Sequence, residues 1–200
     1  MHLIAGEFYH IYNRGNNKQL IFFIDDNYLF FLKKIREQLL PVADIVAYCL
    51  MPNHFHILIR ATEESIKERK SFGGKSMQEF AYRIGVTLSS YTQAVNKANK
   101  TIGSLFQQKT KAKLLAEEIN NRKVSYLEHC FFYIHQNPLT AGLVKQLSDW
   151  KFSSYLDYSE RRNGTLCNKK LLFDYTGFTV TDILNRSETG ISSEIISKLE

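Results

Sequence analysis

The first forty residues pass from a strand-like to a helix-like pattern of apolar positions. Residues 8–14, FYHIYNR, are rich in aromatic and β-branched side chains, which predicts a strand. Asp25 or Asp26 can then cap a helix, and Pro41 ends it. The apolar stripe of that helix recurs at helical spacing and consists of Tyr28, Phe31, Leu32, Ile35 and Leu39. We therefore expect a strand followed by an amphipathic helix.

The next segment has the pattern of a strand hairpin. Residues 44–50 are apolar and β-branched, which is typical of a central strand. Pro52 and Asn53 form a tight turn, and residues 54–60 return as another strand. Because so few residues separate the two strands, we expect them to be neighbours in one sheet.

A polar stretch and a long amphipathic helix follow the hairpin. Residues 61–75 are polar and charged and contain two glycines, which predicts a flexible loop. Ser76 and Glu79 have the spacing of a capping box, so the helix is expected to begin there. Its apolar stripe is Met77, Phe80, Ile84, Leu88, Tyr91 and Val95.

The last predicted strand and helix complete the order of elements. Residues 103–115 are expected to form a strand. Ser125 and Glu128 predict a second capping box, and the helix that it opens is expected to stop at Asn137 and Pro138. The order strand, helix, strand, strand, helix, strand predicts the α+β class with a ferredoxin-like antiparallel sheet (βαββαβ). The final helix is an addition after the last strand.

The C-terminal part of the chain is harder to interpret. Trp150, Phe152 and Tyr155 are expected to pack back on the main domain, and residues 179–200 have the pattern of a small helical tail. We therefore predict one domain over residues 1–155 and a C-terminal extension of unknown role over residues 156–200.

The positive charge is concentrated in the predicted domain. The net charge is +6, and residues 1–137 hold 18 Lys and Arg against 12 Asp and Glu, whereas residues 138–200 hold 8 of each. A basic main body favours a polyanionic partner, because each phosphate contact releases counterions from a nucleic acid. Charge alone does not decide this, since many proteins with a pI near that of this chain, about 9.1, bind no nucleic acid.

Other bulk features favour a cytoplasmic protein. The chain lacks a run of about 18 apolar residues, so no membrane span is expected. Its first residues, MHLIAGEF, lack the pattern of a signal peptide. Cys49, Cys130 and Cys167 are scattered and are interpreted as reduced thiols, of which the first two are expected to pack as small hydrophobes.

Two histidines form the first candidate site. His54 and His56 flank Phe55 on a predicted strand, so both imidazoles point to one face of the sheet. Two imidazoles on one face can supply two ligands to a divalent cation. The alternative is a pair of polar residues on a solvated face. The apolar run of residues 57–59 favours the metal site, because idle imidazoles in an apolar sheet are costly.

Tyr133 and Asn137 form the second candidate site. They lie four residues apart on the last predicted helix and therefore share a face, beside an apolar stripe that comprises Leu127, Cys130, Phe131 and Ile134. Asn137 can supply an oxygen ligand while Tyr133 presents its hydroxyl. Taken alone, Tyr133 is as well explained by packing and Asn137 by helix capping. The pair gains meaning only beside the histidines.

Four stretches of the chain carry a family resemblance. They are YHIYNRGNNKQLIF (9–22), YCLMPNHFHILIR (48–60), GSLFQQKTKAKLL (103–115) and YIHQNPLTAGLV (133–144). Their order and spacing resemble the REP-associated tyrosine transposases, a group within the single-tyrosine, HUH-type transposase superfamily. The resemblance covers about residues 7–155.

The resemblance implies a site and a reaction. It implies a ferredoxin-like fold in which His54, His56 and Asn137 bind Mg²⁺ or Mn²⁺. It also implies that Tyr133 attacks a DNA phosphodiester to give a 5′-phosphotyrosine link, with single-stranded or hairpin DNA as the partner. The chain departs from its relatives at Lys109 and Lys111, where an arginine is usual. A homodimer, and a domesticated rather than a mobile role, are open alternatives.

A separate set of basic residues is expected to hold the DNA. Lys109, Lys111 and Lys113 alternate along the predicted strand, so all three face one way. The alternative is a sheet edge that is protected against aggregation. We expect them to follow the DNA backbone with the help of Arg14, Lys97, Lys100, Arg122 and Lys123. Arg14 ranks first among the helpers because it lies in the first of the four stretches.

Some aromatic and histidine residues near these stretches admit two interpretations. Tyr9, Tyr12 and Phe106 are candidates for stacking on unpaired bases, although aromatic residues in strands more often belong to the core. His10 and His135 are interpreted as hydrogen-bonded structural histidines rather than ligands.

Two rival functions remain. A non-enzymatic ferredoxin-like nucleic-acid-binding protein would use sheet aromatics and need no metal. A two-histidine phosphoesterase that acts on RNA ends would need two separate His-x-Ser/Thr motifs. This chain has a single His-x-His triplet, which argues against that function.

Overall fold

The computed structural model describes residues 1–70, 74, 76–115, 118–119, 124–187, 190 and 196, and within them the main sheet has four antiparallel strands. The strand order is β2-β3-β1-β6. The bounds are β1 (Phe8–Arg14), β2 (Ala43–Met51), β3 (His54–Ala61) and β6 (Lys111–Leu114). This order and these directions confirm the ferredoxin-like α+β prediction.

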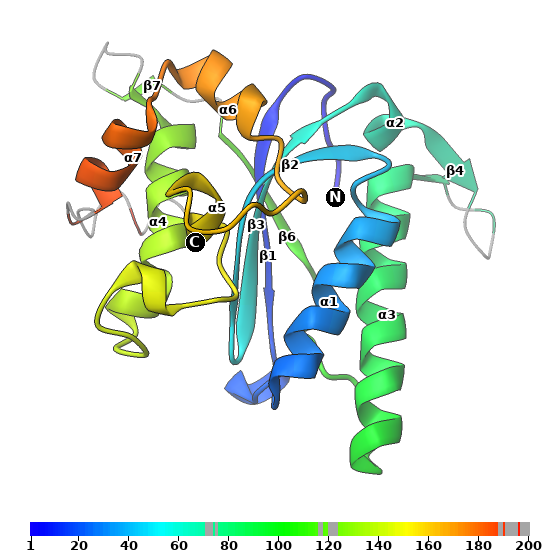
Figure 1. Cartoon of the computed structure of the whole chain (residues 1–200). Coiled ribbons are helices and arrows are strands. Elements are labelled where there is room, and N and C mark those ends of the chain that lie inside the picture. Colours follow the sequence, from blue (N-terminus) through cyan, green and yellow to red (C-terminus); the bar gives the residue numbers. More distant parts are fainter. Residues whose placement is uncertain are drawn as a thin grey trace.

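Helices cover both faces of this sheet (Figure 1). One face carries α1 (Asp25–Gln38) and α3 (Glu79–Asn99). The other face carries α4 (Tyr126–Thr140), with α5 (Tyr155–Tyr158), α6 (Lys169–Thr176) and α7 (Val180–Ser187) beside it. The shorter elements are η1 (Asn16–Lys18), α2 (Glu63–Ile66), β4 (Glu68–Lys70), β5 (Ser76–Gln78), β7 (Glu118–Ile119), β8 (Val124–Ser125) and η2 (Leu147–Asp149).

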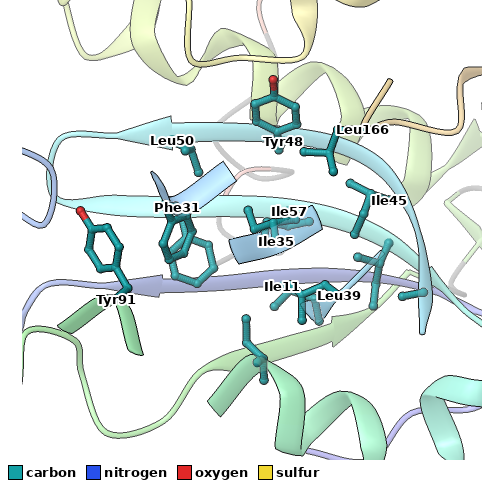
Figure 2. Packing of buried hydrophobic residues seen from close by; sticks show 14 of the residues in the cluster. Ile11, Phe31, Ile35, Leu39, Ile45, Tyr48, Leu50, Ile57, Tyr91 and Leu166 are labelled. Atoms are coloured by element: carbon teal, nitrogen blue, oxygen red, sulfur yellow. The ribbon is translucent and has the colours of Figure 1, made fainter. Parts of the chain in front are cut away.

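Alternation along the strands divides the interior into two apolar cores. Phe55, Ile57 and Ile59 of β3 point toward α1 and α3, where Phe31 and Ile35 meet them (Figure 2). The residue between them in the sequence, Leu58, belongs to the core under α4. Each fully buried side chain of this size contributes about 1.5–3 kcal/mol. The strand that carries both histidines is therefore packed against an apolar core on each of its two faces.

The start of α3 differs from the prediction. Ser76 lies in β5, which pairs with β4 where a loop was expected, and the helix begins at Glu79. The predicted capping box is wrong because both of its ends are engaged elsewhere. The Glu79 carboxylate pairs with Arg83 at 2.7 Å, and the Ser76 hydroxyl donates to the Glu68 carboxylate.

The last predicted strand is shorter than expected. β6 begins at Lys111, and the preceding residues follow β1 without a continuous ladder. The Asn13 side chain holds this stretch instead: its Nδ2 donates to the Gln107 carbonyl at 3.1 Å and to the Thr110 hydroxyl at 2.9 Å. Side-chain bonds of this kind compete with the hydrogen bonds of the backbone ladder, so the regular strand begins only at Lys111.

The helix α4 runs past Pro138 to Thr140, so the prediction that it stops there is wrong. A proline has no backbone N–H to donate, so the helix loses one hydrogen bond. Other bonds at the C-terminal end of α4 offset this loss. Leu143 N donates to the Pro138 carbonyl, and Gly142 adopts the left-handed conformation with φ of 68°. The helix begins at Tyr126, directly after Ser125, as predicted. The capping box itself stays a prediction, because the Ser125 side chain lies outside the described residues, and Glu128 pairs with Arg186 at 2.8 Å.

The segment after α4 returns to the sheet, as predicted. Phe152 stacks on Tyr28 with ring centroids 3.8 Å apart, and the Trp150 indole donates to the Leu50 carbonyl at 3.0 Å. Beyond residue 155, Leu172 and Ile183 are fully buried in the core under α4. The domain boundary at residue 155 stays a prediction.

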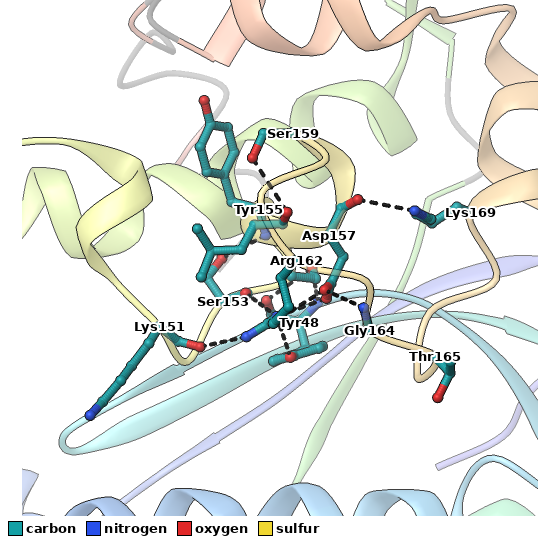
Figure 3. Close-up of polar contacts among 12 residues, drawn as sticks. Tyr48, Lys151, Ser153, Tyr155, Asp157, Ser159, Arg162, Gly164, Thr165 and Lys169 are labelled. Atoms are coloured by element: carbon teal, nitrogen blue, oxygen red, sulfur yellow. Dashed lines mark hydrogen bonds and ion pairs between the residues drawn. The ribbon is translucent and has the colours of Figure 1, made fainter.

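A buried ion pair fastens this segment to β2 (Figure 3). The Arg162 guanidinium contacts both carboxylate oxygens of Asp157 at 2.7 Å and donates to the Tyr48 hydroxyl at 2.9 Å. Asp157 is 2% exposed. A two-pronged bond between planar groups is strong and directional.

No helix in the described ranges is long and apolar enough to cross a membrane.

Candidate active site

The register of β1 and β3 gathers the polar residues of both strands on one face. Arg14 lies opposite His54, and Tyr12 lies opposite His56. Residues that face each other in an antiparallel pair point to the same side. His10 alternates with Tyr12 and therefore joins them. This is the face that α4 covers, while Phe55 points to the other core, as predicted.

Helix α4 brings Tyr133 to the histidines. The Tyr133 ring centroid lies 5.5 Å from that of His56 and 6.0 Å from that of His10. The predicted apolar stripe of the helix, which includes Cys130 and Ile134, is fully buried and fixes the helix against the sheet. Tyr133 and the histidines of one chain therefore lie in contact, and no second copy of the protein is needed to bring them together.

The Nδ1 atom of each candidate histidine ligand has a hydrogen-bond partner. His54 Nδ1 lies 2.6 Å from Asn53 Oδ1, and His56 Nδ1 lies 2.8 Å from His10 Nε2. The other nitrogen of His56, Nε2, is buried and has no hydrogen-bond partner among the residues that the structure describes. The interpretation of His10 as a hydrogen-bonded histidine is confirmed.

Burial keeps His56 neutral. Loss of solvent lowers its pKa well below the ordinary value, and the nearby His10 and His54 rings lower the pKa further. A neutral imidazole is the form that binds a metal ion. His135, one turn away from the site on α4, is a separate case: burial lowers its pKa to about 3, and its Nε2 bonds the Ser154 hydroxyl at 2.7 Å.

Asn137 lies one turn after Tyr133 and is half-buried. Its Nδ2 donates to the Tyr133 carbonyl at 2.9 Å, so its Oδ1 is the atom that remains to act as a ligand. In the described part of the chain, no three His, Cys, Asp or Glu side chains are placed to hold a metal ion. A cation at the histidine pair would therefore need an amide or a substrate oxygen in addition.

A pocket of about 330 Å³ opens in front of the histidines. It is lined by Tyr12, Asn13, Arg14, His54, His56, Gln107 and Lys111. Arg14 Nε is buried in its wall, with no acceptor among the described residues. A guanidinium held in this way offers a site to an anionic oxygen.

The predicted DNA-binding residues fall into three groups. Arg14 and Lys111 line the pocket, and Lys113 follows on the same face of β6, opposite His10. Lys109 does not belong to β6 and lines a separate groove of about 820 Å³ beside α3, so the expected alternation of three lysines is wrong at this position. Arg122 and Lys123 lie outside the described residues.

Of the three aromatic residues considered for stacking on bases, only Tyr12 lines this pocket. Tyr9 and Phe106 are buried in the core with α1 and α3 and are not free to stack on bases. Tyr12 lines the pocket and stacks on His10 with centroids 4.7 Å apart. Gln107 was missed in the sequence, because a glutamine in an irregular stretch has no periodic signal.

The comparisons with known proteins support the same architecture. No protein-family model matches the chain, and no curated protein matches it. A solved structure of a REP-associated tyrosine transposase bound to a REP hairpin is similar, with a TM-score of 0.58 and 20% sequence identity. The likeness covers 80% of this chain and 84% of that chain. The fold is therefore shared with the type of protein that the four sequence stretches resemble.

Proposed function

We propose that this protein is a metal-dependent, single-strand DNA endonuclease and strand transferase that acts at hairpin-flanked repeat DNA. The observation that carries the proposal is the contact of Tyr133 with His56, whose buried Nε2 faces no protein partner in the described chain. The fold likeness to a hairpin-bound transposase supports the choice of DNA as the substrate.

The candidate residues offer a divalent cation two imidazole nitrogens and one amide oxygen. His54 and His56 would hold Mg²⁺ or Mn²⁺ through Nε2, and Asn137 would hold it through Oδ1. The buried, unpaired His56 Nε2 is the test of this fit, because a nitrogen lone pair without a donor is costly unless a cation takes it. When bound, the ion would polarise the scissile phosphate and stabilise the charge on the attacking and leaving oxygens.

Tyr133 would act as the nucleophile. Its hydroxyl loses a proton and attacks phosphorus, the bond from phosphorus to the 3′ oxygen breaks, and that oxygen takes up a proton. The products are a 5′-phosphotyrosine and a free 3′ hydroxyl. Because the phosphodiester is exchanged rather than hydrolysed, a 3′ hydroxyl can reverse the step and join strands without ATP.

Arg14 and Lys111 would hold the DNA strand. Both line the pocket in front of the histidines, and the buried Arg14 Nε lacks an acceptor in the described part of the protein. A phosphate oxygen at this position would satisfy the donor and bring the backbone to Tyr133. Gln107 would contact a sugar or base at the pocket edge.

The rival binding function is less well supported. A ferredoxin-like binder of unpaired bases uses an open sheet face with exposed aromatics. Here helices cover both faces of the sheet, and Tyr9 and Phe106 are buried (Figure 1). Such a binder does not need two histidines in one pocket, one of which contacts Tyr133.

Incubation with a labelled repeat hairpin tests the proposal. We expect a protein–DNA adduct that withstands denaturing electrophoresis, forms only with Mn²⁺ or Mg²⁺, and is absent in Tyr133→Phe. Tyr12→Phe is the matched control, since Tyr12 lines the same pocket and should leave the adduct in place. Hairpin binding without any adduct in the wild type would favour the non-enzymatic binder.

A further inference from the structure

The two candidate ligands share a feature that the metal site alone does not explain. On each histidine Nδ1 lies within hydrogen-bond distance of a polar side chain: Asn53 Oδ1 for His54 and His10 Nε2 for His56. The Asn53 amide is itself oriented, because its Nδ2 faces the Lys18 carbonyl at 3.5 Å. Its oxygen therefore accepts, and His54 Nδ1 is the donor.

The bond between the two imidazoles has two possible directions. A neutral imidazole carries one N–H and one lone pair, so one ring donates and the other accepts. If His10 donated, His56 would carry its proton on Nε2. That N–H would be buried without an acceptor among the described residues, which costs about 1–3 kcal/mol. If His56 donates, Nε2 keeps its lone pair, which a cation can take, whereas an N–H at the same place would exclude one.

We propose that His10 is a positioning residue that accepts the Nδ1–H of His56 and so holds the Nε2 lone pair of that ring toward the cation. The inference rests on the proposed function only in assigning a cation to the pair. Asn53 does the same for His54. The nitrogen that a ligating histidine presents is set by the bond that its other nitrogen makes.

The surroundings of His10 suit this role. Its ring is fully buried, stacks on Tyr12, and lies edge-on to Tyr133 at 6.0 Å. Its ring centroid lies 4.9 Å from that of His56, with the two ring planes 24° apart. A rigid acceptor on β1 thus fixes a ligand on β3 in both tautomer and rotation.

Nitrogen NMR of the metal-free protein tests the proposal directly. Long-range proton–nitrogen spectra of histidine-labelled protein report which ring nitrogen carries the proton, and His56→Gln identifies the His56 signals. We expect the His56 proton on Nδ1 and an unprotonated Nε2. A proton on Nε2 would overturn the proposal.

Two variants at position 10 give a second readout. His10→Phe keeps the ring and removes the acceptor, whereas His10→Gln keeps an acceptor at about the position of Nε2. We expect Mn²⁺ affinity to fall about 10- to 100-fold in His10→Phe and less than about threefold in His10→Gln, since loss of such an outer partner has this effect. Equal loss in both variants, or no loss in either, would contradict a positioning role.

These readouts are separate from DNA cleavage. A protein that shows the expected tautomer and the expected order of Mn²⁺ affinities but forms no adduct would support the role of His10 and count against the nicking function. Absence of Mn²⁺ binding by the wild type would overturn the role of His10.

Discussion

His54 and His56 have different surroundings, although they lie two residues apart on one face of β3. His56 is 4% exposed and contacts Tyr133, while His54 is half-buried at the pocket. Alternation in the sequence predicts their shared face. It does not predict the difference in burial, because that depends on where α4 crosses the sheet. The partnership of His56 with His10 likewise depends on strand register.

The candidate ligands should be needed for chemistry more than for binding. We expect His54→Ala to abolish cleavage of a repeat hairpin, because the cation loses a ligand, while the affinity for single-stranded DNA changes by less than about threefold. Parallel cleavage and fluorescence-anisotropy assays measure the two effects. Equal loss of both would mean that the histidine serves the fold.

Lys111 should contact a phosphate, and Lys109 serves as its comparison. We expect Lys111→Ala to weaken DNA binding and to lower the slope of log affinity against log salt by about one. Lys109→Ala should change the slope less, since Lys109 lines the separate groove beside α3. Titrations at several salt concentrations give both slopes. An unchanged slope in Lys111→Ala would remove this lysine from the contact surface.

At the level of elements, the sequence predicted β1, α1, β2, β3 and the body of α3 closely, because each has a strong period and clear ends. The errors arise where side chains decide the backbone. Asn13 holds the residues before β6 out of the ladder, and Glu79 pairs with Arg83 rather than capping a helix. A local pattern cannot show the Asn13 bond, which joins distant parts of the sequence, and it does not decide whether Glu79 caps the helix or pairs with Arg83 one turn later.

The packing of the segment after α4 should depend on the pair of Asp157 and Arg162. We expect Asp157→Ala to lower the free energy of unfolding by about 2–3 kcal/mol, because it leaves a partly buried charge without its partner. This loss is at or below the low end of the roughly 3–5 kcal/mol that breaking a fully buried ion pair costs, because the Arg162 side chain is 32% exposed. Urea denaturation measures the change.

An exposed ion pair of the same chain is the matched control. Asp174 pairs with Lys170 on α6, and their side chains are 61% and 82% exposed. Asp174→Ala should cost less than about 0.5 kcal/mol. A similar loss in both variants would contradict the special role of the buried pair.

At the scale of the whole molecule, the two faces of the sheet differ in the side chains that are buried against them. The buried side chains of α1 and α3 are apolar except for Thr87, whereas His10 and His56 of the sheet and His135 of α4 are buried on the other side. The resemblance of four short stretches predicted the ferredoxin-like fold that the structure shows, whereas composition gave only a basic chain with a net charge of +6.

Buried histidines should make the fold sensitive to acid. The pKa of His135 is about 3 in the folded chain and about 6.5 when unfolded, so the unfolded state binds the extra proton as the pH falls. The stabilisation is complete above pH 6.5 and is lost toward pH 3. We expect about 2 kcal/mol less stability at pH 5 than at pH 7.5 from this residue.

His135→Gln keeps a partner for Ser154 but cannot titrate. Urea denaturation at the two pH values should show a smaller loss in this variant, by about the same 2 kcal/mol. An unchanged pH dependence would assign the acid sensitivity to His56 and His129, whose pKa values burial also lowers.

The most direct test of the central claim is to locate the covalent bond. Wild-type protein is incubated with a repeat hairpin and Mn²⁺, digested, and analysed by mass spectrometry for a peptide that carries a nucleotide. We predict a 5′-phosphate linked to Tyr133. A linkage at any other residue, or cleavage products with no linked peptide at all, would contradict the assignment of Tyr133 as the nucleophile.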